Sequence, residues 1–204
     1  MIQIAIIAGM NEQRVFIFIG NSGCGKGTQA ALLREKMEAQ DMEILRLELG
    51  DKFREFWQKS GYTAEKSNEL ATSGSLQPEF LAIHIWSHTL IDFFDSNKHL
   101  IADGVPRRIR EAKVLDGALR FYGIEKPTIV YLNISPEVAK ERMLARGRTD
   151  DDMIAIQTRL DWFETEVVRT LDFLQADDYY NFIEIDANKT IEEIHADIMN
   201  KAQI

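Results

Sequence analysis

One run of residues has the types and the spacing that hold a polyphosphate: Gly20-Asn21-Ser22-Gly23-Cys24-Gly25-Lys26-Gly27-Thr28. It matches the pattern Gly-x-x-x-x-Gly-Lys-Ser/Thr and follows the apolar run Val15–Ile19, which is the strand, loop and helix context that a phosphate loop requires. Its glycines let several backbone N–H groups face one point at the positive end of the following helix. Lys26 adds a cation for the β- and γ-phosphates, and the Thr28 hydroxyl can help to position Mg²⁺ or its water shell.

A carboxylate and an arginine follow another apolar run, in the segment Asp103-Gly104-Val105-Pro106-Arg107. A carboxylate at the carboxyl end of a strand, facing a phosphate loop, can serve the water shell of Mg²⁺. Six arginines are candidates for a basic cleft: Arg54, Arg107, Arg142, Arg146, Arg148 and Arg159. Arg142 and Arg146 are four residues apart and Arg148 and Arg159 are eleven apart, so each pair can share a helix face if both members are helical.

The composition is that of an ordinary globular protein, with 204 residues, 45% hydrophobic and 28% charged, and a net charge of −9. The acidic balance argues against a nucleic-acid partner. Cys24 is the single cysteine, so an intramolecular disulfide and a cysteine-based zinc site are excluded, which fits a cytoplasmic location. The apolar stretch Ile2–Ala8 is far shorter than the roughly 20 residues of a membrane span. We expect it to be an extra edge strand or an extension, and we expect no membrane partner.

Strand-like runs alternate with helical stretches along the chain. The expected strands are Val15–Ile19, Ile44–Leu49, Leu100–Ala102, Thr128–Ile134 and Asn181–Ile185. The expected helices are Gly27–Ala39, Pro78–Ser96, Glu111–Phe121, Pro136 to about Arg146 with Ser135 as its cap, about Asp151–Gln175, and Thr190–Ala202. Thr190 and Glu193 form a capping-box pattern. The alternation predicts an α/β fold with a mostly parallel five-stranded sheet covered on both faces, and the ligand is expected beyond the carboxyl ends of the strands.

These motifs together resemble the adenylate kinase family of nucleoside monophosphate kinases, and the similarity covers about residues 14–203 in the right order. The family's phosphate loop, Gly-x-x-Gly-x-Gly-Lys-Gly-Thr-Gln, is matched from Gly20 to Gln29. Its Asp-Gly-Phe-Pro-Arg motif resembles Asp103–Arg107, and its Thr-Gly-Asp-x-x-Arg element resembles Leu49–Arg54. Its Gly-Arg-x-Asp-Asp motif resembles Gly147–Asp151, with Arg159 eight residues past the second aspartate.

The resemblance implies a three-layer P-loop NTPase domain over residues 14–204, after an extension at residues 1–13. It also implies an inserted monophosphate-binding subdomain at about residues 50–80 and a minimal lid at about residues 146–150. The composition of the segment at 50–80 agrees, because it has short polar helical stretches broken by Gly61, Gly74 and Pro78.

The resemblance implies a reaction in which the γ-phosphoryl group of ATP, bound with Mg²⁺, passes reversibly to a nucleoside monophosphate, with AMP the first choice. Phosphoryl transfer needs mainly positioning and charge stabilisation, for which arginine's planar, permanently charged fork is suited. The implied catalytic residues are Lys26, Asp103, Arg107, Arg146, Arg148 and Arg159. The implied ATP-binding residues are Gly20, Ser22, Gly23, Cys24, Gly25, Lys26, Gly27, Thr28 and Arg142. The implied acceptor-binding residues are Leu49, Gly50, Arg54, Gln77, Gly104, Arg107, Glu111, Arg148 and Arg159. Mg²⁺ is expected through a water shell near Thr28 and Asp103, and the protein is expected to be a monomer.

Three departures from the family pattern bear on the reaction. Only Gly147 separates Arg146 from Arg148, so the lid is a stub that could exclude water less well. Leu49 replaces a threonine near the acceptor base. Glu111 replaces a glutamine; an ionised carboxylate only accepts hydrogen bonds, so it suits the N–H groups of guanine or uracil better than adenine N1.

Other readings remain open at this point. GMP, UMP or CMP could be the acceptor, and a small-metabolite kinase or a catalytically weak nucleotide sensor could share the fold. The pair Arg54 and Arg107 argues against an acceptor without phosphate, and retention of all six arginines argues against a sensor. We expect His84 and His88 to pack or lie on the surface, the three tryptophans to pack in the core or the subdomain, and Cys24 to be a small residue tolerated in the loop.

Overall fold

The computed structural model describes residues 13–148 and 152–204. The expectations for Ile2–Ala8 and for Thr149, Asp150 and Asp151 therefore lie outside the described residues. The strands are β1 (Val15–Gly20), β2 (Glu43–Glu48), β3 (Lys98–Asp103), β4 (Thr128–Asn133) and β5 (Asn181–Asp186). The helices are α1 (Lys26–Glu38), α2 (Leu49–Trp57), α3 (Tyr62–Thr72), α4 (Glu79–Phe93), α5 (Ile109–Phe121), α6 (Pro136–Arg146), α7 (Met153–Trp162), α8 (Val168–Gln175) and α9 (Ile191–Ala202).

The strands form one parallel sheet in the order β2-β3-β1-β4-β5. This confirms the expected α/β class and the five-stranded parallel sheet. Because the carboxyl ends of parallel strands meet at one edge, Gly20 at the end of β1 comes close to Asp103 at the end of β3. The phosphate loop and the Asp103 segment therefore share that edge.

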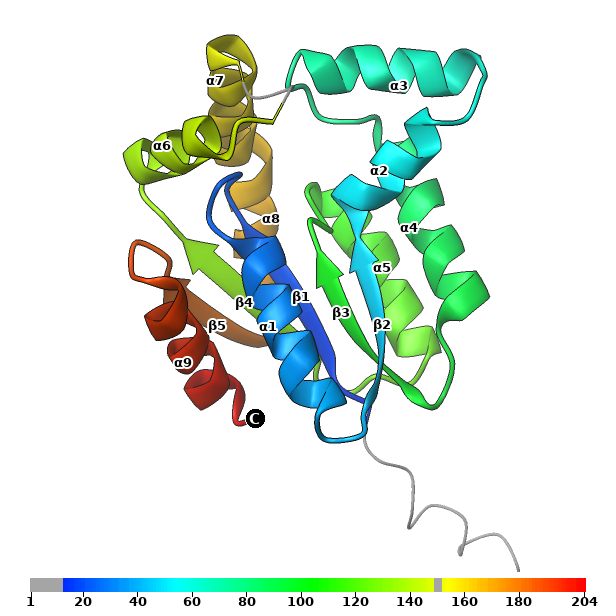
Figure 1. The fold of residues 1–204 in the computed structure, drawn as a ribbon. Helices are drawn as coiled ribbons and strands as arrows, with labels where there is room; N and C mark the ends of the chain where they lie inside the picture. The colour runs from blue at the N-terminus through cyan, green and yellow to red at the C-terminus, as the bar shows by residue number, and fades with distance from the viewer. Residues whose placement is uncertain (1–12, 149–151) are drawn as a thin grey trace, which may run out of the picture.

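Side-chain alternation along β1 divides the core into two layers. Val15, Ile17 and Ile19 pack against one cluster, while Phe16 and Phe18 pack against the other, as the period of two in a strand requires. The first cluster is covered by α4, α5 and α8, and the second by α1 and α9, so the sheet lies between two helical layers (Figure 1). Burial on both faces explains why the central strand β1 is almost continuously apolar, whereas the edge strands β2 and β5 also carry polar residues.

Local capping signals set the helix ends as expected. The Ser135 side chain accepts from the Val138 backbone N–H, with Pro136 in the first turn. Thr190 and Glu193 form the complete capping box at the start of α9. The expected long helix at about 151–175 is instead three segments, because a π-helical turn at Phe163–Val167 joins α7 to α8. Phe163 and Val167, at the two ends of that turn, are both buried in the first cluster.

The segment at about 50–80 holds the short helices α2 and α3, which lie beyond the carboxyl end of β2 (Figure 1). α2 is not wholly polar, because Leu49 and Phe53 are buried in the first cluster. Arg54 on the same helix lines the cleft together with the phosphate loop.

Candidate active site

A single cleft at the carboxyl edge of the sheet collects almost every expected site residue. The expected residues that line it are Ser22, Gly23, Cys24, Gly25, Lys26, Gly27, Thr28, Gly50, Arg54, Gln77, Asp103, Gly104, Arg107, Arg142, Arg146, Arg148 and Arg159. The expected residues outside its lining are Gly20, Leu49 and Glu111.

The phosphate loop is shaped by its glycines and closed by Lys26. Gly23 has a φ of 85°, and a Cβ there would lie 2.5 Å from the Ala139 carbonyl oxygen, so only glycine fits. The Lys26 ammonium donates to the Gly20 carbonyl at 2.9 Å and to the Asn21 carbonyl at 3.0 Å. The lysine cation is therefore held over the loop, among the backbone groups that would surround a phosphate.

Cys24 is part of this loop, but its thiol is not exposed on the loop surface. Its side chain is buried, and burial raises the pKa of its thiol, an effect that the nearby Lys26 charge opposes. A thiol held in its protonated form is a poor nucleophile, which agrees with a packing role.

Two carboxylates converge on the first turn of α1. Glu48 and Asp103 are paired in the β2–β3 register, and a Cβ on Gly27 would lie 3.6 Å from Asp103 Oδ2 and 4.0 Å from Glu48 Oε2. Burial raises the pKa of Asp103, against the charges of Lys26, Arg107 and Arg46. Burial also raises the pKa of Glu48, with Asp103 and Asp51 acting in the same direction. These oxygens and the Thr28 hydroxyl are donors of the kind that Mg²⁺ prefers.

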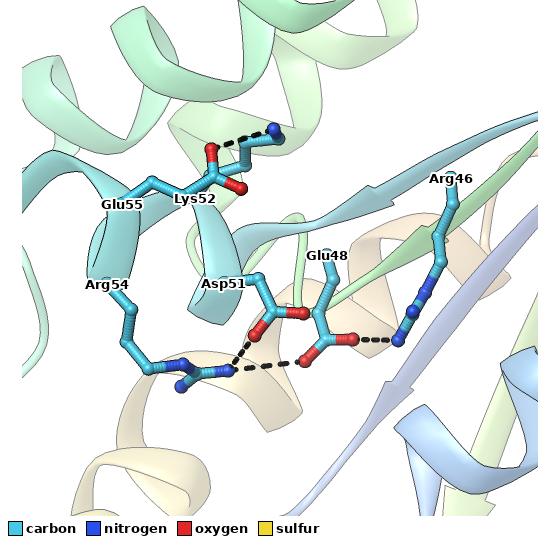
Figure 2. Close-up of polar contacts among 6 residues, drawn as sticks. All are labelled: Arg46, Glu48, Asp51, Lys52, Arg54 and Glu55. Atoms are coloured by element: carbon cyan, nitrogen blue, oxygen red, sulfur yellow. Dashed lines mark hydrogen bonds and ion pairs between the residues drawn. The ribbon is translucent and has the colours of Figure 1, made fainter.

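Arg54 and Arg46 reach Glu48 from two sides. Arg54 donates to Asp51 and, at 3.4 Å, to Glu48 Oε1, while Arg46 forms an ion pair with Glu48 Oε2 (Figure 2). Sequence reasoning missed Arg46 and Glu48 as cleft residues. Their spacing of two residues on β2 puts both on the same face, the one that α1 covers, and only the pairing of β2 with β3 brings them to the loop.

Arg107 is fixed at three points in the cleft. Its Nε donates to the Gly104 carbonyl at 3.0 Å, its backbone N–H donates to Glu111 Oε2 at 3.1 Å, and its guanidinium lies over the Trp162 ring. Burial lowers the pKa of the Arg107 guanidinium, which the charges of Glu111 and Asp103 oppose. Burial raises the pKa of Glu111, which the Arg107 backbone contact opposes.

The remaining arginines approach from the other side of the cleft. Arg142 on α6 donates to the Ala187 and Lys189 carbonyls at 2.9 and 3.3 Å, so it braces the loop before α9. Arg148 and Arg159 do not share a helix face, because the condition that both are helical is not met. α6 ends at Arg146, and Gly147 has a left-handed φ of 63°, so Arg148 lies beyond the helix that carries Arg146. Arg159 on α7 still meets Arg148 at the same cleft.

Gln77 lines the cleft through a side chain that is tied to α3. Its Oε1 accepts from Ser67 Oγ at 2.7 Å, and its Nε2 donates to the Ser67 carbonyl at 2.8 Å. Trp57 and Trp162 also line the cleft, although the sequence suggested only packing for them. Trp162 Nε1 donates to the Gly74 carbonyl at 2.9 Å, and the ring lies under Arg107.

The histidine pair outside the cleft behaves as a surface feature. The His84 and His88 rings stack with centroids 6.1 Å apart, and His88 contacts Asp92 at 3.0 Å. Within residues 13–148 and 152–204, no group of three or more histidine, cysteine, aspartate or glutamate side chains is arranged to hold a metal ion. No helix in that part of the chain is long and apolar enough to cross a membrane.

Comparison with known proteins places this architecture in a family. The sequence model described as Adenylate kinase matches residues 18–179. The chain is 30% identical over 178 residues to an adenylate kinase of Corynebacterium urealyticum, covering 87% of this chain and 93% of that protein. It is 31% identical over 180 residues to one of Corynebacterium diphtheriae, covering 88% and 94%. It is 34% identical over 198 residues to one of Azobacteroides pseudotrichonymphae, covering 89% and 93%.

Proposed function

The chain belongs to the adenylate kinase family of nucleoside monophosphate kinases, and we propose that it transfers the γ-phosphoryl group of ATP reversibly to AMP. The observation that carries this proposal is the cleft, where Lys26 on α1 and the six expected arginines, on α2, α6, α7 and the loops after β3 and α6, reach one space. Binding a single triphosphate would not require cations on both sides of the loop. Two phosphate-bearing ligands placed end to end would.

We assign the two sides of the cleft by the elements that build them. Lys26, Thr28 and the backbone N–H groups at the start of α1 hold the donor phosphates, and Arg142 lies at the donor base. Arg54 on α2 and Arg107 after β3 hold the acceptor phosphate. Arg146, Arg148 and Arg159 surround the group in transfer, where fixed positive charge stabilises the transition state.

Mg²⁺ fits the oxygen donors beside the loop. The oxygen donors at the start of α1 are the Thr28 hydroxyl and the carboxylates of Asp103 and Glu48. They would hold the ion, or its water shell, next to the donor phosphates. When bound, the ion neutralises charge that develops on the phosphate oxygens. Asp103, buried at the end of β3, would accept hydrogen bonds from the water shell of the ion.

AMP is proposed as acceptor because the relatives described above carry the name adenylate kinase. Glu111 keeps GMP or UMP as a second candidate, since its carboxylate cannot donate to adenine N1. Its Oε2 accepts from the Arg107 backbone N–H, and its side chain does not line the cleft. Glu111 would therefore act on the acceptor base from a position next to Arg107. A monomeric state, the subdomain at about 50–80 and a cytoplasmic location are further proposals. Sedimentation would test the monomeric state, and cell fractionation would test the location.

The experiment is ADP formation from ATP with AMP, GMP, CMP or UMP as acceptor, each with Mg²⁺ and with the metal chelated. We expect the largest kcat/KM with AMP and almost none without the metal. Preference for another monophosphate would keep the kinase and overturn the acceptor. ADP formation that ignores every acceptor would favour a nucleotide sensor with residual hydrolysis.

A further inference from the structure

Glu48 contacts both arginines of the β2–α2 corner, Arg46 and Arg54. Its Oε1 accepts from Arg54 Nη2 at 3.4 Å, and its Oε2 pairs with Arg46 Nη2 (Figure 2). Its side chain is 17% exposed, whereas that of Arg54 is 43% exposed. The arginine that would hold the acceptor phosphate is thus already bound to a protein carboxylate.

Arg54 offers the same nitrogen to two carboxylates. Its Nη2 contacts both Asp51 and Glu48, and Asp51 lies three residues away on the same helix. Because Asp51 moves with Arg54 on α2, the Asp51 contact can persist when the guanidinium turns. The Glu48 contact is longer and joins two elements, β2 and α2. It is therefore the contact that an incoming phosphate would replace.

Arg46 lets Glu48 give up Arg54 without being left unpaired. Their ion pair lies on one strand, two residues apart, and does not depend on α2. An unpaired, largely buried carboxylate would be costly, and Glu48 already faces the carboxylates of Asp103 and Asp51. With Arg46 in place, the exchange at Arg54 swaps one anion for another.

From these contacts we propose that Glu48 acts as an internal competitor for the acceptor phosphate at Arg54, and so sets the affinity for the monophosphate. This rests on the proposed function, because it assumes that Arg54 holds the acceptor. The sequence element Leu49–Arg54 resembles the family pattern, and Glu48 stands just before it, so the competitor lies outside that motif.

The test is calorimetric titration of AMP, without ATP or Mg²⁺, into the wild type and Glu48→Gln. The substitution keeps shape and removes the charge. Partly exposed ion pairs are weak, so we expect a dissociation constant about two- to fivefold lower in Glu48→Gln. The matched control is Glu55→Gln, which removes the same charge from the pair with Lys52 on α2, outside the cleft lining (Figure 2). Its AMP affinity should equal that of the wild type.

A double-mutant cycle separates competition at Arg54 from a general change in charge. In an Arg54→Gln background, Glu48→Gln should leave AMP affinity unchanged. The same gain with and without Arg54, or an equal gain in Glu55→Gln, would overturn the proposal. So would weaker binding in Glu48→Gln, which would mean that Glu48 positions Arg54 instead of occupying it.

Parallel transfer assays keep this inference distinct from the proposed function. A wild type that phosphorylates AMP while Glu48→Gln binds AMP no better would overturn the competitor role alone. A folded wild type that neither binds nor phosphorylates AMP would overturn both.

Discussion

The guanidinium of Arg107 lies over the ring of Trp162, with its central carbon 5.4 Å from the ring centroid. The two residues come from distant parts of the chain, one after β3 and the other at the end of α7. The indole N–H of Trp162 also donates to the Gly74 carbonyl. One side chain therefore connects an expected acceptor arginine to the segment between α3 and α4.

Replacing Trp162 separates these two roles. Cation–π contacts are worth about 0.5–2 kcal/mol, so Trp162→Leu should raise KM for the monophosphate roughly 2- to 30-fold, with KM for ATP little changed. Trp162→Phe keeps a ring and loses the bond to Gly74, so its KM for the monophosphate should be nearer the wild type. Steady-state kinetics with each substrate varied would decide. Equal losses in both variants would assign the effect to the Gly74 bond and not to the ring.

Arg107→Ala tests the division of the cleft into donor and acceptor sides. Hydrogen bonds to charged groups are worth about 1.5–3 kcal/mol, so the dissociation constant for the monophosphate should rise roughly 10- to 100-fold while that for ATP stays nearly constant. Calorimetric titration with each nucleotide alone measures this. A loss confined to ATP would reverse the assignment.

Asp103→Asn should make the protein more stable at neutral pH, although it removes an expected ligand of the Mg²⁺ water shell. Burial holds the pKa of Asp103 above its unfolded value of about 3.9. The native carboxyl group therefore binds its proton more tightly than the unfolded one, and the resulting stability is full below pH 3.9 and lost as pH rises through the native pKa. Asparagine avoids that loss.

Urea unfolding between pH 4 and pH 8 measures the prediction. The free energy of unfolding of Asp103→Asn should exceed that of the wild type at pH 8, and the two should converge toward pH 4. Asp178→Asn, at an exposed carboxylate, is the control. A variant less stable than the wild type across the range would show that Lys26, Arg107 and Arg46 outweigh the burial.

Glu111→Gln tests the choice of acceptor base. Glu111 is buried outside the cleft lining, so a glutamine amide reaches adenine N1 only where the bound base packs beside Arg107. A hydrogen bond gained there would be worth about 0.5–1.5 kcal/mol, so kcat/KM for AMP relative to GMP and UMP should rise roughly 2- to 10-fold. The glutamine carbonyl can still accept from the Arg107 backbone N–H in the place of Oε2. Unchanged selectivity would mean that Glu111 serves only to hold Arg107.

The parts of this protein that sequence predicts best are those written in local patterns. The phosphate loop, the Ser135 cap and the Thr190–Glu193 capping box depend on neighbouring residues, and so does the alternation that predicts the parallel sheet. Asp103 was placed correctly because a strand end is itself a local signal.

The sequence did not predict the features that depend on strand register, on the exact end of a helix or on contacts between distant residues. Arg46 and Glu48 enter the cleft only because β2 pairs with β3 so that Glu48 lies beside Asp103. Arg148 and Arg159 could share a helix face only if both were helical, and Arg148 is not, because Gly147 ends α6 and α7 begins at Met153. Trp162 looked like a packing residue because its partner Arg107 lies 55 positions earlier in the chain.

The most direct test of the central claim is the stoichiometry of nucleotide conversion. Wild-type protein with Mg²⁺, ATP and AMP should consume one AMP for each ATP and form two ADP, with little free phosphate, as measured by ³¹P NMR. Lys26→Met should fold normally and lose roughly 10²-fold or more in rate, because the transferring group loses a preorganised cation. One ADP and one phosphate per ATP, with AMP untouched, or a folded Lys26→Met protein as fast as the wild type, would contradict the account.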